Sequence, residues 1–535
     1  MVGGGSRVAD VYANRSVFVT GASGFLGKVM LEKLLFSTNV KAIYVLIRPL
    51  KGHTAKERLD SILKSPIFDR IRETDSSAFQ KLKPVTGDLM NECLGLSEED
   101  QNEIFENVSI VFHCAATVRF DEAIRVSVRM NLVGTQRLIA LCHKIKNLIS
   151  VVHASTAYAN CHLSSTEEKV YEPPVHPQKL VHAIEWMNDD MLETITPALL
   201  DKRPNTYTLT KALAESQLLE DAKDLPIIMI RPSIIGAMWR EPLPGWTDNV
   251  NGPTGIIAAV GKGVLTNMCG SVVSKADIIP VDIVSNMMIV AGAHRATTKY
   301  TEIPVMHCAS GELNPIKWHR LVVFLQRMFH QNPLDECYRV PTTHFHESRR
   351  LFLFNFYYKH YIPAKLLDLF NRGVGKKANN VRIYGKVWKM IETLHFFTTR
   401  GWNFESNNLV TLWNTLSPED QKEFNFDVRQ INWDDYLFDY VMGIKVYLLH
   451  ENLDNLPKAR ANLARLKQVS LYWNAGFWAL LVRLFFWKRT RTQKWALWLL
   501  GFASTYLFQN FDFRPSVNLK TIEDYKASAA LVKSF

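Results

Sequence analysis

Two hydrophobic patterns alternate along the N-terminal part of this chain. Short, continuous apolar runs of the kind that form buried strands occur at 16–20, 42–47, 83–89, 108–116 and 148–154. Between them, segments such as 25–36 carry apolar residues at helical spacing. Strands that alternate with helices pair in parallel, so the pattern predicts an α/β fold with a doubly wound parallel sheet. Ligands of such sheets bind at the carboxyl ends of the strands.

Beyond about residue 351 this alternation stops, and helical segments rich in aromatic residues begin. Ser417 starts one such helix, because a capping serine is followed by Pro418 and by two acidic residues in the first turn. At 535 residues the chain exceeds one ordinary core. We therefore predict an N-terminal tail, an α/β unit, a smaller helical unit and a C-terminal tail, at 1–14, 15–350, 351–455 and 456–535.

The first apolar run ends in a glycine-rich turn that leads into a helix. Its spacing is GxxGxxG rather than the GxGxxG of many dehydrogenases. In a strand–turn–helix, Gly21 permits the tight turn, Gly24 lets backbone approach a pyrophosphate, and Gly27 lets the helix pack on the strand. The alternative is an ordinary glycine turn. We expect a dinucleotide to contact this turn through Thr20, Gly21, Ser23, Gly24, Phe25, Leu26 and Gly27.

The residue after the second run suggests which dinucleotide binds. An acid commonly stands there to bind the ribose 2′-hydroxyl of NAD, but this chain has Arg48. A guanidinium suits a 2′-phosphate, which favours NADPH. The alternative is that Arg48 is an ordinary surface arginine without a role in binding. The next strands end in an acid that reaches toward the adenine and in small residues that let the cofactor lie on backbone. These residues are Asp88, Leu89, Ala115 and Ala116.

A candidate chemical centre lies further along the chain. Tyr207 and Lys211 are four residues apart, so they share one face of a helix. We expect the ammonium, together with the positive nicotinamide of the oxidised cofactor, to lower the pKa of the phenol toward a useful range, and Lys211 also to hold the cofactor. Ser155 or Thr156, at the end of the preceding strand, offers a hydroxyl to a substrate carbonyl. A lone YxxxK pair is common in helices, so the interpretation of Tyr207 and Lys211 as a catalytic pair depends on the cofactor motif that precedes them.

Together these strings resemble those of extended short-chain dehydrogenase/reductases, and specifically of fatty acyl-CoA reductases, over residues 15 to 455. The matching strings are TGASGFLGK (20–28), HCAATVRFD (113–121), NLVGT (131–135), HASTAYAN (153–160), PNTYTLTKALAE (204–215), RPSIIGA (231–237) and ADIIPVDIV (276–284). The resemblance implies that Tyr207, Lys211 and Thr156 or Ser155 are catalytic. It adds Asn131, Pro232 and Ser233 to the cofactor site. By the same resemblance Asn131 supports the catalytic helix and a proton-relay water, and the alternative is a helix-capping asparagine.

The resemblance also implies the reaction, which is the reduction of a long-chain acyl-CoA to a primary alcohol by two NADPH. The helical unit would then cover the acyl pocket, and a homodimer is compatible with this reading. Two segments near the centre have no settled role. The insert 161–204 is either a lid or a surface excursion, and 252–265 is a candidate entrance. The rivals are a reductase of this fold acting on a sterol or another lipid carbonyl, and a catalytically silent lipid-associated scaffold.

Net charge is +11, and much of the excess lies in one C-terminal stretch. Residues 455–494 contain no acid, and their basic residues are Lys458, Arg460, Arg465, Lys467, Arg483, Lys488, Arg489, Arg491 and Lys494. Because long apolar runs separate these cations, an anionic membrane surface explains them better than nucleic acid. We expect 471–487 to lie in the membrane interface and 495–513 to insert or span. The alternative is a buried helical hairpin.

The compartment follows from the cysteines and the N-terminus. The seven cysteines show no metal-ligand spacing and no disulfide framework, and no apolar signal segment precedes Asp10. We therefore expect no metal, and a catalytic unit that faces the cytosol on an intracellular membrane, at the endoplasmic reticulum, a lipid droplet or a peroxisome.

Overall fold

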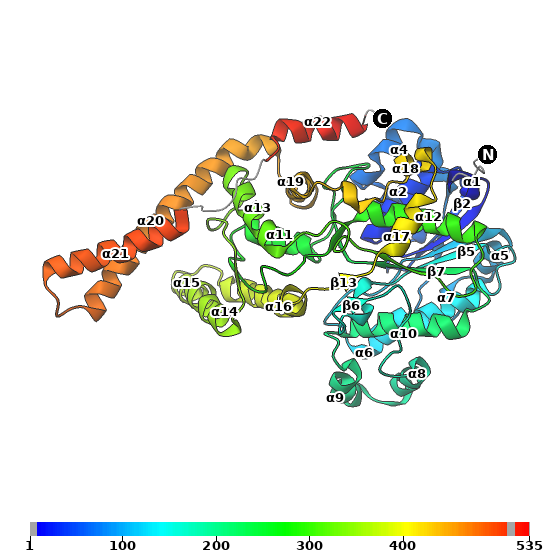
Figure 1. The fold of residues 1–535 in the computed structure, drawn as a ribbon, viewed down its shortest axis with the longest axis horizontal. Coiled ribbons are helices and arrows are strands. Elements are labelled where there is room, and N and C mark those ends of the chain that lie inside the picture. The colour runs from blue at the N-terminus through cyan, green and yellow to red at the C-terminus, as the bar shows by residue number, and fades with distance from the viewer. Residues whose placement is uncertain (1–7, 511–518, 534–535) are drawn as a thin grey trace.

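A seven-stranded parallel sheet forms the centre of the computed structural model, which describes residues 8–510 and 519–533. The strand order is β11-β7-β5-β4-β1-β2-β3, so the chain winds outward from β1 in both directions (Figure 1). The predicted doubly wound α/β fold is confirmed. The strands are β1 (Ser16–Thr20), β2 (Ala42–Ile47), β3 (Leu82–Thr86), β4 (Val108–His113), β5 (Ser150–Ala154), β7 (Ile227–Pro232) and β11 (Val305–Cys308).

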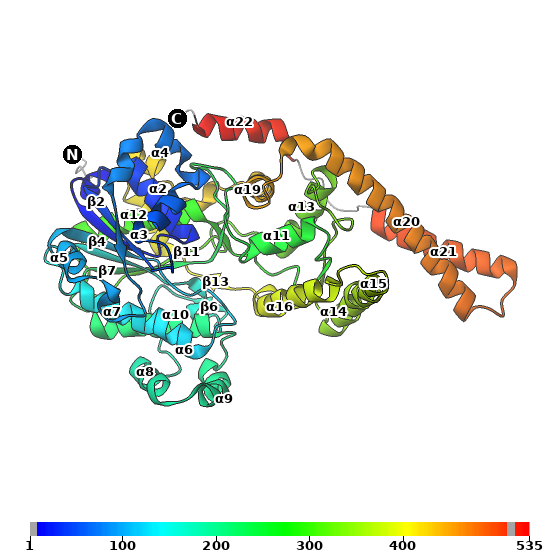
Figure 2. The same cartoon turned by 180° about the vertical axis from the view of Figure 1, so that it is seen from behind.

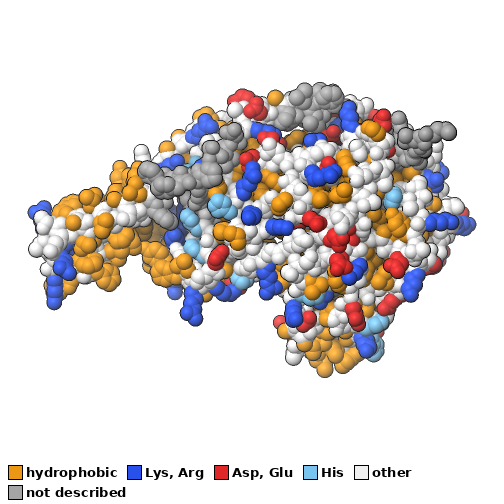
Figure 3. All heavy atoms as spheres, in the orientation of Figure 1, with side chains coloured by type: hydrophobic (Ala, Val, Ile, Leu, Met, Phe, Trp, Pro, Cys, Tyr) orange, Lys and Arg blue, Asp and Glu red, His pale blue; other side chains and the backbone are white. Residues whose placement is uncertain are grey.

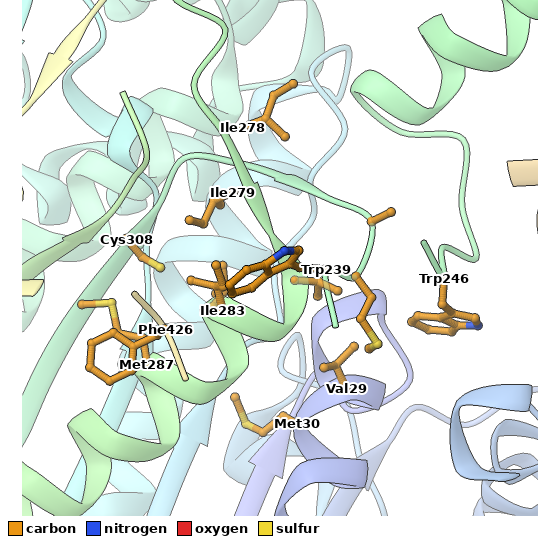
Figure 4. Packing of buried hydrophobic residues seen from close by; sticks show 14 of the residues in the cluster. Val29, Met30, Trp239, Trp246, Ile278, Ile279, Ile283, Met287, Cys308 and Phe426 are labelled. Atoms are coloured by element: carbon orange, nitrogen blue, oxygen red, sulfur yellow. The ribbon is translucent and has the colours of Figure 1, made fainter. Parts of the chain in front are cut away.

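Helices cover both faces of the sheet because its strands are apolar on both sides. In β1, Val17 and Val19 join one core cluster, and Phe18 joins the other. The first cluster includes α2 (Phe25–Ser37) and α12 (Val281–Thr297), whose Val29, Met30, Ile283 and Met287 appear in Figure 4. The second cluster includes residues of α5 (Glu98–Asn107), α7 (Gly134–Cys142) and α10 (Thr206–Asp221).

The remaining elements are short or peripheral to the sheet. The other helices of the α/β part are α1 (Val8–Tyr12), α3 (Ala55–Leu63), α4 (Asp69–Thr74), α6 (Ile124–Ser127), α8 (Pro177–Trp186), α9 (Asp189–Leu200), α11 (Pro253–Gly261) and α13 (Trp318–Gln331). The short parallel pairs are β8 (Ile234–Gly236) with β10 (Ile278–Pro280), β9 (Asn267–Cys269) with β12 (His344–His346), and β6 (Ser165–Thr166) with β13 (Asn403–Phe404).

Helices α8 and α9 of the insert 161–204 form a small layer below the sheet in Figure 1. Leu180 and Ile184 of α8 and Leu192 of α9 pack on Leu209 and Leu213 of α10 in their own apolar cluster. This packing supports the helix that carries Tyr207 from its outer side. The residues that line the cavity described below include none from this insert, and the choice between a lid and a surface excursion stays open.

The helical C-terminal part packs against the α/β part instead of standing apart from it. Its helices are α14 (Arg349–Phe356), α15 (Ile362–Gly373), α16 (Asn380–Thr398), α17 (Asn407–Asn414), α18 (Pro418–Glu423) and α19 (Trp433–Gly443). Phe426 lies beside Met287 of α12 in the first core cluster (Figure 4), and Leu409 and Tyr436 belong to the same cluster. One apolar core therefore runs from the sheet into this part. The boundary at residue 350 stays a prediction.

The last helices form an arm that projects from the body. In Figures 1 and 2, α20 (Leu456–Phe485) and α21 (Arg491–Asn510) lie side by side at one end of the molecule, and α22 (Ile522–Lys533) lies back over the body. Trp478 Nε1 donates to Thr505 Oγ1 at 2.7 Å, and Trp498 Nε1 donates to the Ala475 carbonyl at 2.9 Å. The arm is thus a packed helical hairpin.

Within the described residues, no helix combines the length and the apolar character that crossing a membrane requires. The segment 495–513 was expected to insert or span; its described residues 495–510 do not form a helix able to span, and its residues 511–513 lie outside the described part. Polar residues interrupt α21, including Gln493, Lys494 and Thr505.

Candidate functional site

A cavity of about 1070 Å³ opens at the carboxyl ends of the central strands and brings the sequence-predicted residues together. Nearly all of them line it: Gly21, Ser23, Gly24, Phe25, Leu26, Gly27, Arg48, Asp88, Leu89, Ala115, Ala116, Ser155, Thr156, Tyr207, Lys211, Pro232 and Ser233. Thr20 and Asn131 do not line it. Residues from six strands or strand ends therefore meet at one site, as the parallel sheet requires.

The glycine turn leaves no room for side chains. Gly21 has a φ of +77°, and a Cβ there would lie 2.6 Å from the Ala115 backbone nitrogen. A Cβ on Gly27 would lie 2.3 Å from the Gly21 carbonyl oxygen. Gly24 precedes α2 and carries no side chain to cap it, so the first N–H groups of the helix are open to an anion. This cradle fits the pyrophosphate of a dinucleotide.

The rim of the cradle carries an arginine and an acid. Arg48 is exposed directly after β2, and its carbonyl accepts a hydrogen bond from the Arg58 guanidinium. Asp88 follows β3 and accepts a hydrogen bond from the Met90 N–H at 3.0 Å. Both side chains line the cavity, so the guanidinium is placed where it can meet a phosphate, and the carboxylate stands at the neighbouring strand end.

Thr20 and Asn131 support the site from behind the lining of the cavity, and their expected contact with the cofactor stays a prediction. Thr20 is fully buried; its Oγ1 lies 2.8 Å from His113 Nδ1 and accepts from the Ala115 N–H at 3.4 Å. Asn131 sits in the π-helical turn η4 (Val128–Val133), where its Nδ2 donates to Thr210 Oγ1 at 3.0 Å. Its Oδ1 accepts from the Thr117 N–H at 2.9 Å. Asn131 thus ties α10 to the loop after β4.

Tyr207 and Lys211 share the cavity face of α10. Asn205 caps this helix by accepting from the Thr208 N–H at 2.9 Å. Lys211 is buried, and its Nζ donates to the Ala154 carbonyl at 2.6 Å. Burial lowers the pKa of Lys211 to about 8.

The expected lowering of the Tyr207 pKa is not seen among the protein's own groups. Burial raises the pKa of the phenol to about 12, and a hydrogen bond with Thr156 opposes that shift in part. Desolvation disfavours the phenolate, and it outweighs the nearby polar groups. Tyr207 is therefore a protonated phenol here, in the form that a proton donor requires.

The two neighbouring hydroxyls, which the sequence left as alternatives, have different partners. Ser155 Oγ donates to Glu215 Oε1 at 2.5 Å. Glu215 is buried and forms two hydrogen bonds with Arg231, from Nε at 2.8 Å and from Nη2 at 2.7 Å. Thr156 Oγ1 instead accepts from the Tyr158 N–H at 3.2 Å, donates to the Pro232 carbonyl at a long 3.5 Å, and contacts Tyr207. Thr156 is therefore the hydroxyl that lies beside Tyr207, whereas Ser155 is held by Glu215.

Several cavity residues were not anticipated from the sequence. Phe120 lies between Tyr207 and Phe397, with ring centroids 5.7 and 5.4 Å away. Tyr158 packs edge-on against Phe397 at 5.3 Å. Residues 248–253 and one face of α16 complete the wall. The sequence predicted that the helical part covers the pocket and that 252–265 forms an entrance, and both predictions concern these regions. No local motif identifies the individual side chains.

Comparisons with known proteins agree with this geometry. A family model described as "Male sterility protein" with an NAD-binding designation matches residues 19–288, and a second model of that description matches 359–451. The chain is 38% identical to fatty acyl-CoA reductase 2 of Mus musculus, over 96% of this chain and 100% of that protein. It is 39% identical to fatty acyl-CoA reductase 1 of Rattus norvegicus, over 96% and 99%.

Solved structures share the fold at lower identity. The reductase domain of a nonribosomal peptide synthetase from Mycobacterium tuberculosis aligns with a TM-score of 0.57 at 17% identity, covering 83% of this chain and 95% of that one. The terminal reductase domain of the myxalamid pathway aligns with a TM-score of 0.54 at 18% identity, covering 82% and 91%. The glycine cradle, the Tyr207–Lys211 pair and the near full-length similarity agree, and this chain belongs to the fatty acyl-CoA reductase family.

Proposed function

We propose that this protein uses NADPH to reduce long-chain fatty acyl-CoA, through the aldehyde, to the primary alcohol with release of CoA. The observation that carries the proposal is the placement of Tyr207, Thr156 and Lys211 in one cavity with the glycine cradle. The family supports the acyl-CoA substrate, since the reductases from mouse and rat carry it in their names.

The chain's own residues divide the chemistry among them. When bound, NADPH supplies the hydride that reduces the carbonyl carbon. As the carbonyl oxygen gains negative charge, hydrogen bonds from Tyr207 and Thr156 stabilise it. Loss of the CoA thiolate from the first adduct leaves the aldehyde, and in the second reduction Tyr207 transfers its proton to the oxygen. Lys211, held by the Ala154 carbonyl, has further N–H donors for the cofactor ribose and a charge that favours the developing phenolate.

The function is tested by mixing detergent-solubilised protein with palmitoyl-CoA and NADPH. We expect hexadecanol at two NADPH per acyl-CoA. Tyr207→Phe removes the proton donor and keeps the ring, so we expect kcat to fall by about 10²- to 10⁴-fold. Cofactor affinity, measured by NADPH fluorescence, should stay close to that of the wild type. Undiminished turnover in Tyr207→Phe contradicts the assigned role, and NADPH binding without any turnover favours the scaffold alternative.

The two hydroxyls give a matched pair of variants. Thr156→Ala removes the group that contacts Tyr207, so we expect kcat to fall by about 10²-fold. Ser155→Ala removes a donor that serves Glu215, so we expect a smaller loss of kcat. Steady-state kinetics on both variants measures the difference. A larger loss in Ser155→Ala than in Thr156→Ala would reverse the assignment.

Arg48 is proposed to select NADPH over NADH through the 2′-phosphate. Arg48→Gln should weaken NADPH binding by about 10- to 100-fold, because one charge-assisted contact is lost, and should leave NADH binding nearly unchanged. Lys56→Gln, on the exposed face of α3 and outside the cavity lining, is the control. Equilibrium fluorescence titration with both nucleotides measures the change. Equal weakening of both would show that Arg48 does not read the phosphate.

We also propose that the α20–α21 arm binds an anionic membrane surface, with the catalytic part in the cytosol on an intracellular membrane. Figure 3 shows hydrophobic side chains gathered along the arm, and Trp473, Phe485 and Trp487 are 74, 74 and 66% exposed. Lys488, Arg489, Arg491 and Lys494 lie at the connection between its two helices. Exposed apolar side chains beside a cluster of cations suit an interfacial position.

Vesicle flotation tests this surface. Trp473→Ser combined with Trp487→Ser should lower binding to phosphatidylserine-containing vesicles by about tenfold, because two large apolar groups no longer enter the interface. Trp186→Ser is the matched control, since Trp186 is 58% exposed on α8, in the separate layer of the insert. Equal effects of the arm and control variants would contradict an arm-specific membrane contact.

A further inference from the structure

One face of α16 lines the cavity, and its side chains change from charged to apolar along the helix. Its cavity-lining residues recur at helical spacing and are Lys386, Lys389, Met390, Thr393, Leu394, Phe397 and Thr398. The charged members stand at the N-terminal end of this stripe, and the apolar members follow toward the C-terminal end. At a rise of about 1.5 Å per residue, Lys386 lies about 16 Å along the helix from Phe397.

The apolar end of the stripe meets the catalytic residues. Phe397 packs on Phe120, and Phe120 packs on Tyr207. A ligand whose carbonyl reacts at Tyr207 and that extends along α16 therefore passes neutral side chains first and then reaches the cations. A fatty acyl chain matches only the first part of this path, because an alkyl end gains nothing beside ammonium groups.

A third cation joins the lysines from the loop after β4. Arg119 lines the cavity, and its Nε lies 3.5 Å from Asp121 Oδ1, while Lys389 Nζ lies 2.6 Å from Asp121 Oδ2. Asp121 thus holds Arg119 and Lys389 near one another. Glu122 Oε2 lies 3.9 Å from Arg119 Nε, so part of the positive charge is balanced. Lys386 is exposed and forms no ion pair with any residue that the structure describes.

We infer that Arg119, Lys386 and Lys389 bind the phosphate groups of the CoA carrier, with its neutral pantetheine arm lying along the α16 stripe. The inference rests on the proposed acyl-CoA substrate and adds where its carrier lies. Ammonium and guanidinium groups are the usual partners of phosphate, and the neutral arm of CoA separates its thioester from its phosphates. The acyl chain then occupies a part of the cavity away from the cationic end of α16.

The test compares two thioesters that differ only in the phosphate-bearing part. Palmitoyl-CoA and S-palmitoyl-pantetheine carry the same acyl chain and the same thioester. For Lys386→Gln combined with Lys389→Gln we expect KM for palmitoyl-CoA to rise about tenfold, and KM for the pantetheine thioester to change much less. Asp121→Asn frees two cations, so it should lower KM for palmitoyl-CoA. Lys365→Gln combined with Lys376→Gln is the control, because these exposed lysines lie outside the cavity lining.

Other results overturn the inference. Equal KM changes for both thioesters would mean that the lysines only shape the channel, and no change for either would exclude a contact. Loss of vesicle flotation with unchanged KM for palmitoyl-CoA would assign the cations to lipid headgroups. Calorimetric titration with free CoA separates the inference from the proposed function. CoA binding that weakens in the lysine variant supports the site even if no thioester is reduced, and wild-type protein that does not bind CoA overturns it.

Discussion

The buried ion pair between Glu215 and Arg231 is the interaction on which the arrangement of this site depends. Both side chains are almost inaccessible to solvent, at 1 and 2% exposed. Arg231 belongs to β7 and Glu215 to the helix that carries Tyr207 and Lys211, so the pair fixes that helix to the sheet. Removal of either partner would leave an uncompensated buried charge, which costs about 3–5 kcal/mol.

The same pair links the helix of Tyr207 and Lys211 to the C-terminal part. Arg231 Nη2 donates to the Lys169 carbonyl at 2.8 Å, and Nη1 lies 3.3 Å from His307 Nε2. The His307 N–H donates to Glu168 Oε1 at 2.8 Å, and Glu168 Oε2 accepts from the Asn408 N–H of α17 at 2.7 Å. The start of the insert, the edge strand β11 and α17 therefore meet at one polar network. This network ties α17 of the helical part to the edge of the sheet.

A second constraint acts on the backbone of the glycine cradle. Gly21 brings the turn against the backbone after β4, closer than any side chain allows, and α2 starts with open N–H groups. The cradle thus depends on glycines that lack side chains. The end of the site with Tyr207 and Lys211 depends on buried charged groups. Desolvation raises the pKa of Tyr207 and lowers the pKa of Lys211, so both titrations depend on the burial of this face of α10.

The sequence by itself determined the sheet, the glycine cradle and the Tyr207–Lys211 pair. Those features are local, because strand length, turn chemistry and the four-residue repeat of a helix are set by neighbours in the chain. Only the tertiary structure shows that Ser155 and Thr156 have different partners, since Glu215 lies sixty positions from Ser155. The tertiary structure also places Thr20 and Asn131 behind the lining of the cavity, and it places α16 in the cavity wall. These placements depend on long-range packing and on which buried polar groups form hydrogen bonds with each other. No local sequence pattern predicts them.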